Sequence, residues 1–450
     1  MIRRATLRLQ ALGAFAAMLI AVSMAPQPAG ATTVQRVVSP GGIEAWLVHE
    51  PSLPLVALNF AFVGGATADP ADKPGVGHMV SSLLDDGAGE LDAKAFQRRV
   101  EDNAVQLRFS VTQDYFSGSI RLLKDRQDPS FDLLRLALNQ PRFDADAIGR
   151  VREQIMAGLR RETTDPGSIA SKEWWRTAFP GHPYGRPTGG TLTSVPTITA
   201  DDLRTYVKQV LTRDTLKVAA VGDIDAATLG KVLDTVFGSL PATGTRITVP
   251  DALVRDGGRR IVVQLNVPQA VVRMGGEGLM RKDPDFIPAY VVNHILGGGS
   301  FTSRLYEEVR EKRGLAYGVY SYLLTMRHAA MFMASTQTQA GSTREALELI
   351  EAQVARMVKD GPTEDELVKA KAYLKGSYAL NFDTSTKIAG ILLQNQLDDL
   401  GIDYIEKRDA MMDAVSIEDT RRAAKRLAEG GMLVTVVGQP KDLASKEPGG

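Results

Sequence analysis

Two segments of this chain end in the same way, and this repetition constrains the fold most. Residues 199–211 lead into a short apolar run closed by Gly222, and residues 416–427 lead into a similar run closed by Gly438. Each leading segment starts with a Thr or Ser, a common N-cap of an amphipathic helix, and a short apolar run bounded by glycine is typical of a buried strand. The pattern predicts two halves of similar plan.

The beginnings of the two halves agree with this interpretation. Strands are predicted at residues 43–48, 55–62, 260–267 and 270–275, and helices at residues 146–161 and 363–379. A segment rich in proline, glycine and threonine starts after Leu240 and predicts a linker. A single continuous α/β domain is the alternative, but one core of so many residues would be unusual.

We therefore expect an α+β protein with two homologous α/β-sandwich lobes facing a central cleft. The expected N-terminal lobe covers residues 32–240, the linker residues 241–257 and the C-terminal lobe residues 258–445.

The first residues have the pattern of a secretory signal peptide. Three arginines among the first eight residues precede an apolar run over residues 11–25, and small residues surround Ala31. An uncleaved membrane anchor is the alternative, but the run is short for spanning a bilayer. We expect residues 1–31 to be removed after Ala31, a periplasmic or otherwise exported protein, and no membrane span in the mature chain.

The composition excludes several classes of function. Lys+Arg and Asp+Glu each number 53, so no overall charge attracts nucleic acid or an anionic membrane, and we expect no nucleic-acid partner. The chain has no cysteine, which excludes disulfides, thiolate nucleophiles and Cys-ligated zinc.

The segment from Gly75 to Gly87 has the form of a zinc-binding helix whose working residues are replaced. A helix with His at i and i+4 can hold Zn²⁺, and a Glu at i+3 can act as general base. Only His78 is present here, because Ser81 stands at the base position and Ser82 at the second ligand position. Neither hydroxyl can act as a base at neutral pH or as a good zinc ligand.

This segment, with the run that precedes it from Gly64, resembles the inverted zinc motif His-x-x-Glu-His of the pitrilysin/insulinase family of zinc metallopeptidases. The resemblance extends from about Val34 to Gly438 and is greatest for short members related to mitochondrial processing peptidase. It implies a third zinc ligand, a Glu, near Ala157, but neither Glu153 nor Glu162 is clearly in register. Both are weak candidates, and we expect this chain to bind no cofactor.

A second resemblance lies in residues 296–321, where Arg310 and Tyr317 are seven positions apart. In the family, an Arg and a Tyr at this spacing face the zinc site of the opposite lobe, hold substrate backbone and stabilise the oxyanion. Arg310 could instead be an exposed helix charge beside Glu307 and Glu311, and Tyr317 could be a core residue.

The resemblance implies a non-catalytic, substrate-binding subunit of an exported heteromeric zinc endopeptidase. Such a chain would be inactive alone and would require a homologous catalytic subunit that carries His-x-x-Glu-His and the zinc ion. Its substrates would be unfolded peptides bound in extended form. Two alternatives remain: a self-sufficient zinc metallopeptidase with an atypical site formed by His78 and Glu153 or Glu162, and a non-enzymatic scaffold subunit.

Overall fold

The computed structural model of the chain describes residues 33–447. The predicted signal peptide over residues 1–31 lies outside the described residues. Within residues 33–447, no helix has both the length and the apolar character needed to cross a bilayer.

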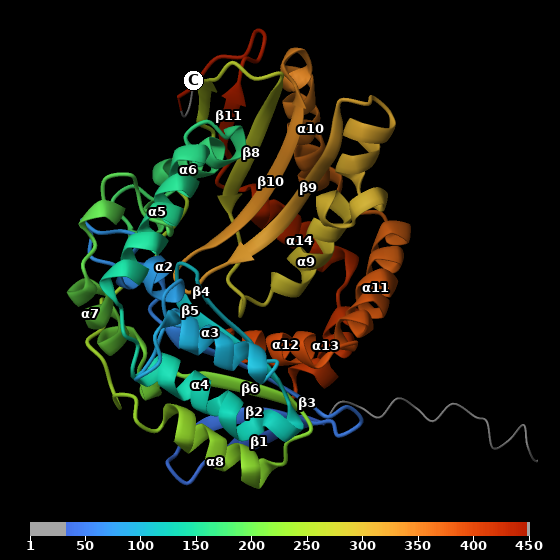
Figure 1. Cartoon of the computed structure of the whole chain (residues 1–450). Coiled ribbons are helices and arrows are strands. Elements are labelled where there is room, and N and C mark those ends of the chain that lie inside the picture. The colour runs from blue at the N-terminus through green and yellow to red at the C-terminus, as the bar shows by residue number, and fades with distance from the viewer. Residues whose placement is uncertain (1–32, 448–450) are drawn as a thin grey trace, which may run out of the picture. The chain divides into compact units, whose positions relative to one another are not determined.

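Six strands form the first sheet, in the order β1-β2-β6-β3-β5-β4 (Figure 1). β2 and β6 are parallel, whereas β3 is antiparallel to both of its neighbours, β6 and β5. The strands are β1 (Gln35–Val38), β2 (Glu44–His49), β3 (Leu55–Val63), β4 (Gln106–Val111), β5 (Tyr115–Leu123) and β6 (Lys217–Gly222).

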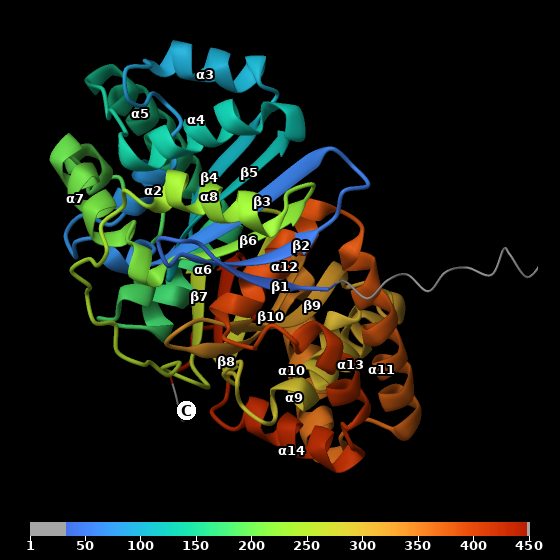
Figure 2. The ribbon, with the colours of Figure 1, turned by 90° about the horizontal axis from the view of Figure 1, so that it is seen from below.

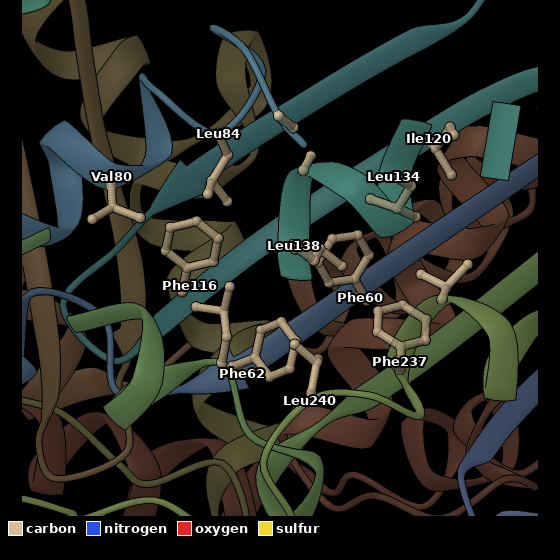
Figure 3. Close-up of a cluster of buried hydrophobic side chains, with 14 of the residues drawn as sticks. Phe60, Phe62, Val80, Leu84, Phe116, Ile120, Leu134, Leu138, Phe237 and Leu240 are labelled. Atoms are coloured by element: carbon tan, nitrogen blue, oxygen red, sulfur yellow. The ribbon is translucent and has the colours of Figure 1, made fainter. Parts of the chain in front are cut away.

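The chain forms seven α-helices between β3 and the end of its first half, within the described residues. They are α2 (Val76–Ser81), α3 (Ala93–Asp102), α4 (Gln127–Asn139), α5 (Ala145–Glu162), α6 (Pro166–Ala178), α7 (Ala200–Val210) and α8 (Ala226–Phe237). Large side chains at alternate positions of β3 pack against α4 and α8, as for Phe60, whose ring lies 5.3 Å from that of Phe237 (Figure 3).

Five strands form the second sheet, in the order β7-β11-β8-β10-β9. They are β7 (Arg260–Gln264), β8 (Gln269–Glu277), β9 (Ala316–Thr325), β10 (Ala330–Gln339) and β11 (Leu433–Gly438). The helices of this half are α9 (Phe286–Asn293), α10 (Thr343–Asp360), α11 (Glu364–Ala379), α12 (Ser385–Leu397), α13 (Tyr404–Asp413) and α14 (Ile417–Ala428). The parallel pair β7–β11 corresponds to β2–β6, so the expected α+β class with two lobes of similar plan is confirmed.

Short helical turns connect these elements. The 3₁₀ turns are η1 (Ala66–Ala68), η2 (Lys124–Arg126), η3 (Pro183–Gly185), η4 (Val195–Thr197), η5 (Arg213–Thr215), η7 (Ser300–Thr302), η9 (Ala340–Ser342) and η10 (Leu380–Phe382). Two π-helical turns, η6 (His294–Gly298) and η8 (Tyr306–Glu311), precede β9. Residues 241–257 contain neither helix nor strand.

Capping boxes define the start of the helix that precedes the closing strand in each half, α7 before β6 and α14 before β11. The Thr199 side chain accepts from the Asp202 N–H, and the Asp202 carboxylate accepts from the Thr199 N–H. Ser416 and Asp419 make the same reciprocal pair before α14. The predicted N-cap at Thr199 is thus confirmed, and equivalent helices of the two halves begin by the same local chemistry.

Each half contributes one helix to the sheet of the other half. α6 packs against β8 and β11, where the Trp174 Nε1–H donates to the Leu433 carbonyl over 3.1 Å. α12 packs against β3 and β6 (Figure 2). There the Gln396 side-chain amide donates to the Val218 carbonyl over 2.8 Å. Both sheets are therefore covered on two faces, the second face by a helix from the other half of the sequence.

Small residues allow these exchanged helices to come close to the sheets. On the α12 face of β3, Ala57 and Ala61 flank Asn59. In β8, a Cβ atom at Gly275 would lie 2.4 Å from a ring carbon of Trp174, so this position requires glycine. In the first lobe, β3 thus places large side chains toward the helical layer and small ones toward the exchanged helix, whereas in the second lobe Met331 and Met333 pack with Trp174 of the exchanged helix.

Candidate functional site

α2 carries His78 and is fixed at its start by a buried carboxylate. Gly75 precedes the helix with φ 104°, a left-handed conformation that favours glycine. Asp69, which is 1% exposed, accepts hydrogen bonds from the backbone N–H groups of Gly75 (2.7 Å) and Gly77 (2.8 Å). Asp69 thereby satisfies N–H groups at the start of α2, which have no partner within the helix.

The two serines of the replaced motif bond to their own helix. The hydroxyls of Ser81 and Ser82 both donate to the carbonyl of His78, over 2.8 and 3.0 Å, and the Ser82 N–H donates to the same oxygen. Side chains that bond back in this way compete with continued helical bonding. α2 accordingly ends at Ser81, and its two hydroxyl protons are engaged with a backbone oxygen.

The carboxylates considered as third ligands lie at different places on α5. Glu153 is exposed to solvent, whereas Glu162 pairs with Lys172 over 2.7 Å. Burial lowers the pKa of His78, and the charge of Glu162 opposes this shift. The imidazole is therefore neutral at pH 7, with one carboxylate near it that already has a cationic partner.

These donors do not fit a zinc ion. A structural site requires four ligands and a catalytic site three protein ligands plus water, whereas α2 offers one imidazole and two hydroxyls already bonded to a carbonyl. Residues 33–447 contain no group of three His, Cys, Asp or Glu side chains that could hold a metal ion. No reaction step through a metal on this chain follows from this geometry.

The carboxylate that starts α2 makes folding stability depend on pH. Burial raises the pKa of Asp69 to about 7, against the opposing effect of the Gly77 and Gly75 N–H donors. Between its ordinary value and about 7 the folded state binds more protons than the unfolded state, so this group lowers stability as pH rises. We expect the difference in unfolding free energy between the unmodified chain and Asp69→Asn to shrink from about pH 5 to about pH 8, measured by urea denaturation.

Asp165 provides the control for this experiment. It is the exposed N-cap of α6, and its hydrogen bonds to Ser168 lower its pKa. Its titration therefore lies below the tested range, and the Asp165→Asn difference should stay constant. The expectation for Asp69 is wrong if the difference in unfolding free energy between the unmodified chain and Asp69→Asn is equally constant over this pH range.

Arg310 lies on η8 and contacts an aromatic ring. Its guanidinium carbon is 4.7 Å from the ring centre of Tyr306, and Nη1 donates to the Tyr306 hydroxyl. The neighbouring cations behave differently, because Lys312 and Arg313 both pair with Glu308. Among the described residues, no carboxylate forms an ion pair with Arg310, so the alternative with Glu307 or Glu311 as its partner does not explain its position.

Tyr317 is 87% exposed, so core packing does not explain it. It lies at the start of β9, an edge strand of the second sheet. There Tyr317 and Gly318 together lie opposite the single residue Gln337 of β10. This bulge changes the alternation of the strand, so that Ala316 and Val319 are both buried and Tyr317 points to solvent. The extra residue in the strand thus exposes the phenol.

Arg310 and Tyr317 lie on one short segment, but among the described residues no hydrogen bond or cation–π contact joins their side chains. The predictions from sequence include neither Tyr306 as a partner of Arg310 nor Asp69 as the residue that fixes α2. The four-residue spacing from Tyr306 to Arg310 on a helical segment was the available indication. Asp69 had no comparable indication, because its contacts depend on a loop conformation.

A cavity of about 550 Å³ lies elsewhere, lined by residues that include Tyr115, Trp175, Arg281 and Asp398. Its lining includes neither the α2 residues nor Arg310 or Tyr317. Arg281 Nε and Asp398 Oδ2 lie 3.8 Å apart, so the two side chains offset each other's charge. This cavity and the residues predicted to act on a substrate therefore lie at separate places.

Comparison with known proteins identifies the family. The profile described as insulinase (peptidase family M16) matches residues 45–192, and the profile described as peptidase M16 inactive domain matches residues 197–374. The chain belongs to peptidase family M16. The expected resemblance to the pitrilysin/insulinase family is thus confirmed, and the replaced zinc motif makes this chain a non-catalytic M16 peptidase homologue.

Relatives that match over most of their length support this assignment to M16. An uncharacterized zinc protease of Streptomyces coelicolor is 26% identical, over 92% of this chain and 91% of that protein. The non-peptidase homolog YmxG of Helicobacter pylori is 27% identical, over 74% of this chain and 77% of that protein. The crystal structure of a peptidase M16 inactive domain from Pseudomonas fluorescens covers 92% of this chain and 100% of that chain, with 28% identity and a TM-score of 0.86.

Proposed function

We propose that this chain is the non-catalytic, substrate-binding subunit of an exported zinc endopeptidase built from two related chains. The observation that carries the proposal is a combination. α2 has lost the base and the second zinc ligand, while the same chain has an Arg310 whose partner is a neutral phenol and a Tyr317 that is exposed. Two serines cannot activate water, whereas a guanidinium and a phenol can donate hydrogen bonds to a peptide carbonyl. Water activation would come from the partner.

In this proposal the two chains divide the chemistry. The partner carries His-x-x-Glu-His, the zinc ion and the attacking water. Arg310 and Tyr317 of this chain donate hydrogen bonds to the substrate backbone and to the oxyanion that develops during attack on the peptide carbonyl. Because backbone groups are recognised, the substrates are unfolded peptides in extended form, with weak selectivity for side chains.

Two further observations support the proposal. The relative in Helicobacter pylori is described as a non-peptidase homolog and matches most of this chain. The arginine-flanked apolar run at the start of the sequence supports export, with removal of residues 1–31. The assembly would therefore process peptides outside the cytoplasm.

The test compares the chain alone with the complex that it forms. The mature chain, purified alone, should contain no stoichiometric zinc and should not cleave an internally quenched unfolded peptide. An affinity-tagged copy recovered from native cells should copurify with a related chain that carries His-x-x-Glu-His, and this complex should cleave the peptide.

Other outcomes would favour other functions. Cleavage and stoichiometric zinc in the chain alone, both lost in His78→Ala, would establish a self-sufficient peptidase. A complex that keeps full activity with Arg310→Ala and Tyr317→Phe would establish a scaffold role.

A further inference from the structure

Tyr306 and Arg310 form a defined pair on η8. The guanidinium of Arg310 lies over the phenol ring, 4.7 Å from its centre, and also donates to the hydroxyl of the same residue. Tyr306 is 7% exposed, whereas Arg310 is only partly buried. The buried member of the pair is fixed by the fold and therefore sets the direction of the other.

Neighbouring side chains hold Tyr306 in place. Leu305 and Val309, on the same turn, are fully buried in the core of the second lobe. The ring of Phe301 meets that of Tyr306 edge to face, with 5.1 Å between the ring centres. Burial and the contact with Phe301 therefore restrict the position of the Tyr306 ring.

The type of partner matters for the charge of Arg310. A carboxylate would offset the positive charge, as Glu308 does for Lys312 and Arg313. A phenol ring and a neutral hydroxyl orient the guanidinium through cation–π attraction and one hydrogen bond, and they leave its charge intact. Most of its five N–H donors stay available to a ligand oxygen.

We propose that Tyr306 is a positioning residue that holds the Arg310 guanidinium ready for a substrate carbonyl oxygen. This inference rests on the proposed function, in which Arg310 contacts peptide backbone. Tyr306 acts through Arg310 and does not itself touch the substrate. Fixing the long arginine side chain before binding removes the cost of ordering it when the peptide arrives.

The test is a double-mutant cycle on the copurified complex, with kcat/KM for the quenched unfolded peptide as the readout. Tyr306→Leu should lower kcat/KM about tenfold, and Tyr306→Phe, which keeps the ring, should lower it less. In an Arg310→Ala background, Tyr306→Leu should cause no further loss. A purely structural role would lower activity by the same factor in both backgrounds, and that result would overturn the inference.

Tyr404 supplies a matched control, because it is also 7% exposed and forms a pair with Arg281, which donates to its hydroxyl over 2.6 Å. Tyr404→Leu should leave kcat/KM unchanged if the effect belongs to Arg310. Thermal unfolding of each variant separates loss of fold from loss of orientation, and Tyr306→Phe keeps the test valid if Tyr306→Leu unfolds. If Arg310→Ala lowers activity but both Tyr306 variants match the unmodified complex, only this inference is wrong. If Arg310→Ala has no effect, the proposed function is wrong as well.

Discussion

Replacement of Trp174 by alanine is expected to lower the free energy of unfolding by about 3 to 5 kcal/mol, the usual cost of removing a large aromatic side chain from a core. Trp174 is fully buried between α6 and the second sheet, and its indole N–H donates to the Leu433 carbonyl. The substitution removes both the packing of the indole against Gly275 and its hydrogen bond to Leu433. Urea denaturation followed by circular dichroism measures it.

The neighbouring Trp175 provides the matched control. It is only partly buried, and its ring lies 5.4 Å from that of Phe179 and 5.3 Å from that of Trp174, between ring centres. Trp175→Ala should therefore cost clearly less than Trp174→Ala. Equal losses would show that the exchanged helix contributes no more than an ordinary aromatic contact.

Arg310→Ala is expected to lower kcat/KM of the copurified complex by about 10² to 10³, the range found when one oxyanion donor is removed. Three cations lie within residues 310–313. Lys312 and Arg313 pair with a carboxylate, whereas Arg310 is held by the neutral phenol of Tyr306, so its remaining N–H donors can bind a ligand. Hydrolysis of the quenched peptide under single-turnover conditions measures the chemical step, and size-exclusion chromatography checks that the complex forms.

Arg313→Ala is the control, because it removes the same charge from the same segment while Arg313 itself pairs with Glu308. It should change kcat/KM little. If the two arginine variants lose activity equally, the effect comes from the local net charge and not from a directed contact, and the role given to Arg310 is wrong. Arg310→Lys should recover only part of the activity, since lysine lacks the planar fork of donors.

The regular elements could be predicted from sequence because they follow local rules. The capped helix after Thr199 and the apolar strand that ends at Gly222 were visible as periodic patterns. The repeat of these patterns near Gly438 correctly indicated two lobes of similar plan. Such features depend on neighbouring residues and therefore appear in a single sequence.

The exchanged helices could not be predicted in this way. α6 has an ordinary amphipathic sequence. No pattern within it predicts that Trp174 packs on the second sheet, whose strands come much later in the chain. At the candidate site, the replaced residues Ser81 and Ser82 were evident from spacing, but their bonds to the His78 carbonyl were not. The bulge that exposes Tyr317 was equally hidden, because it depends on pairing with β10.

The exchange of α6 and α12 has a consequence for how this polypeptide reaches its native state. The Trp174–Leu433 bond spans 259 residues and the Gln396–Val218 bond spans 178. The second face of the first sheet is therefore covered only once α12 is available, and the second sheet is complete only once β11 is available. Synthesis proceeds from the amino end, so the face of the first sheet that α12 covers stays uncovered while the second half of the chain is made. The first lobe therefore reaches its final packing only after most of the second lobe has been made.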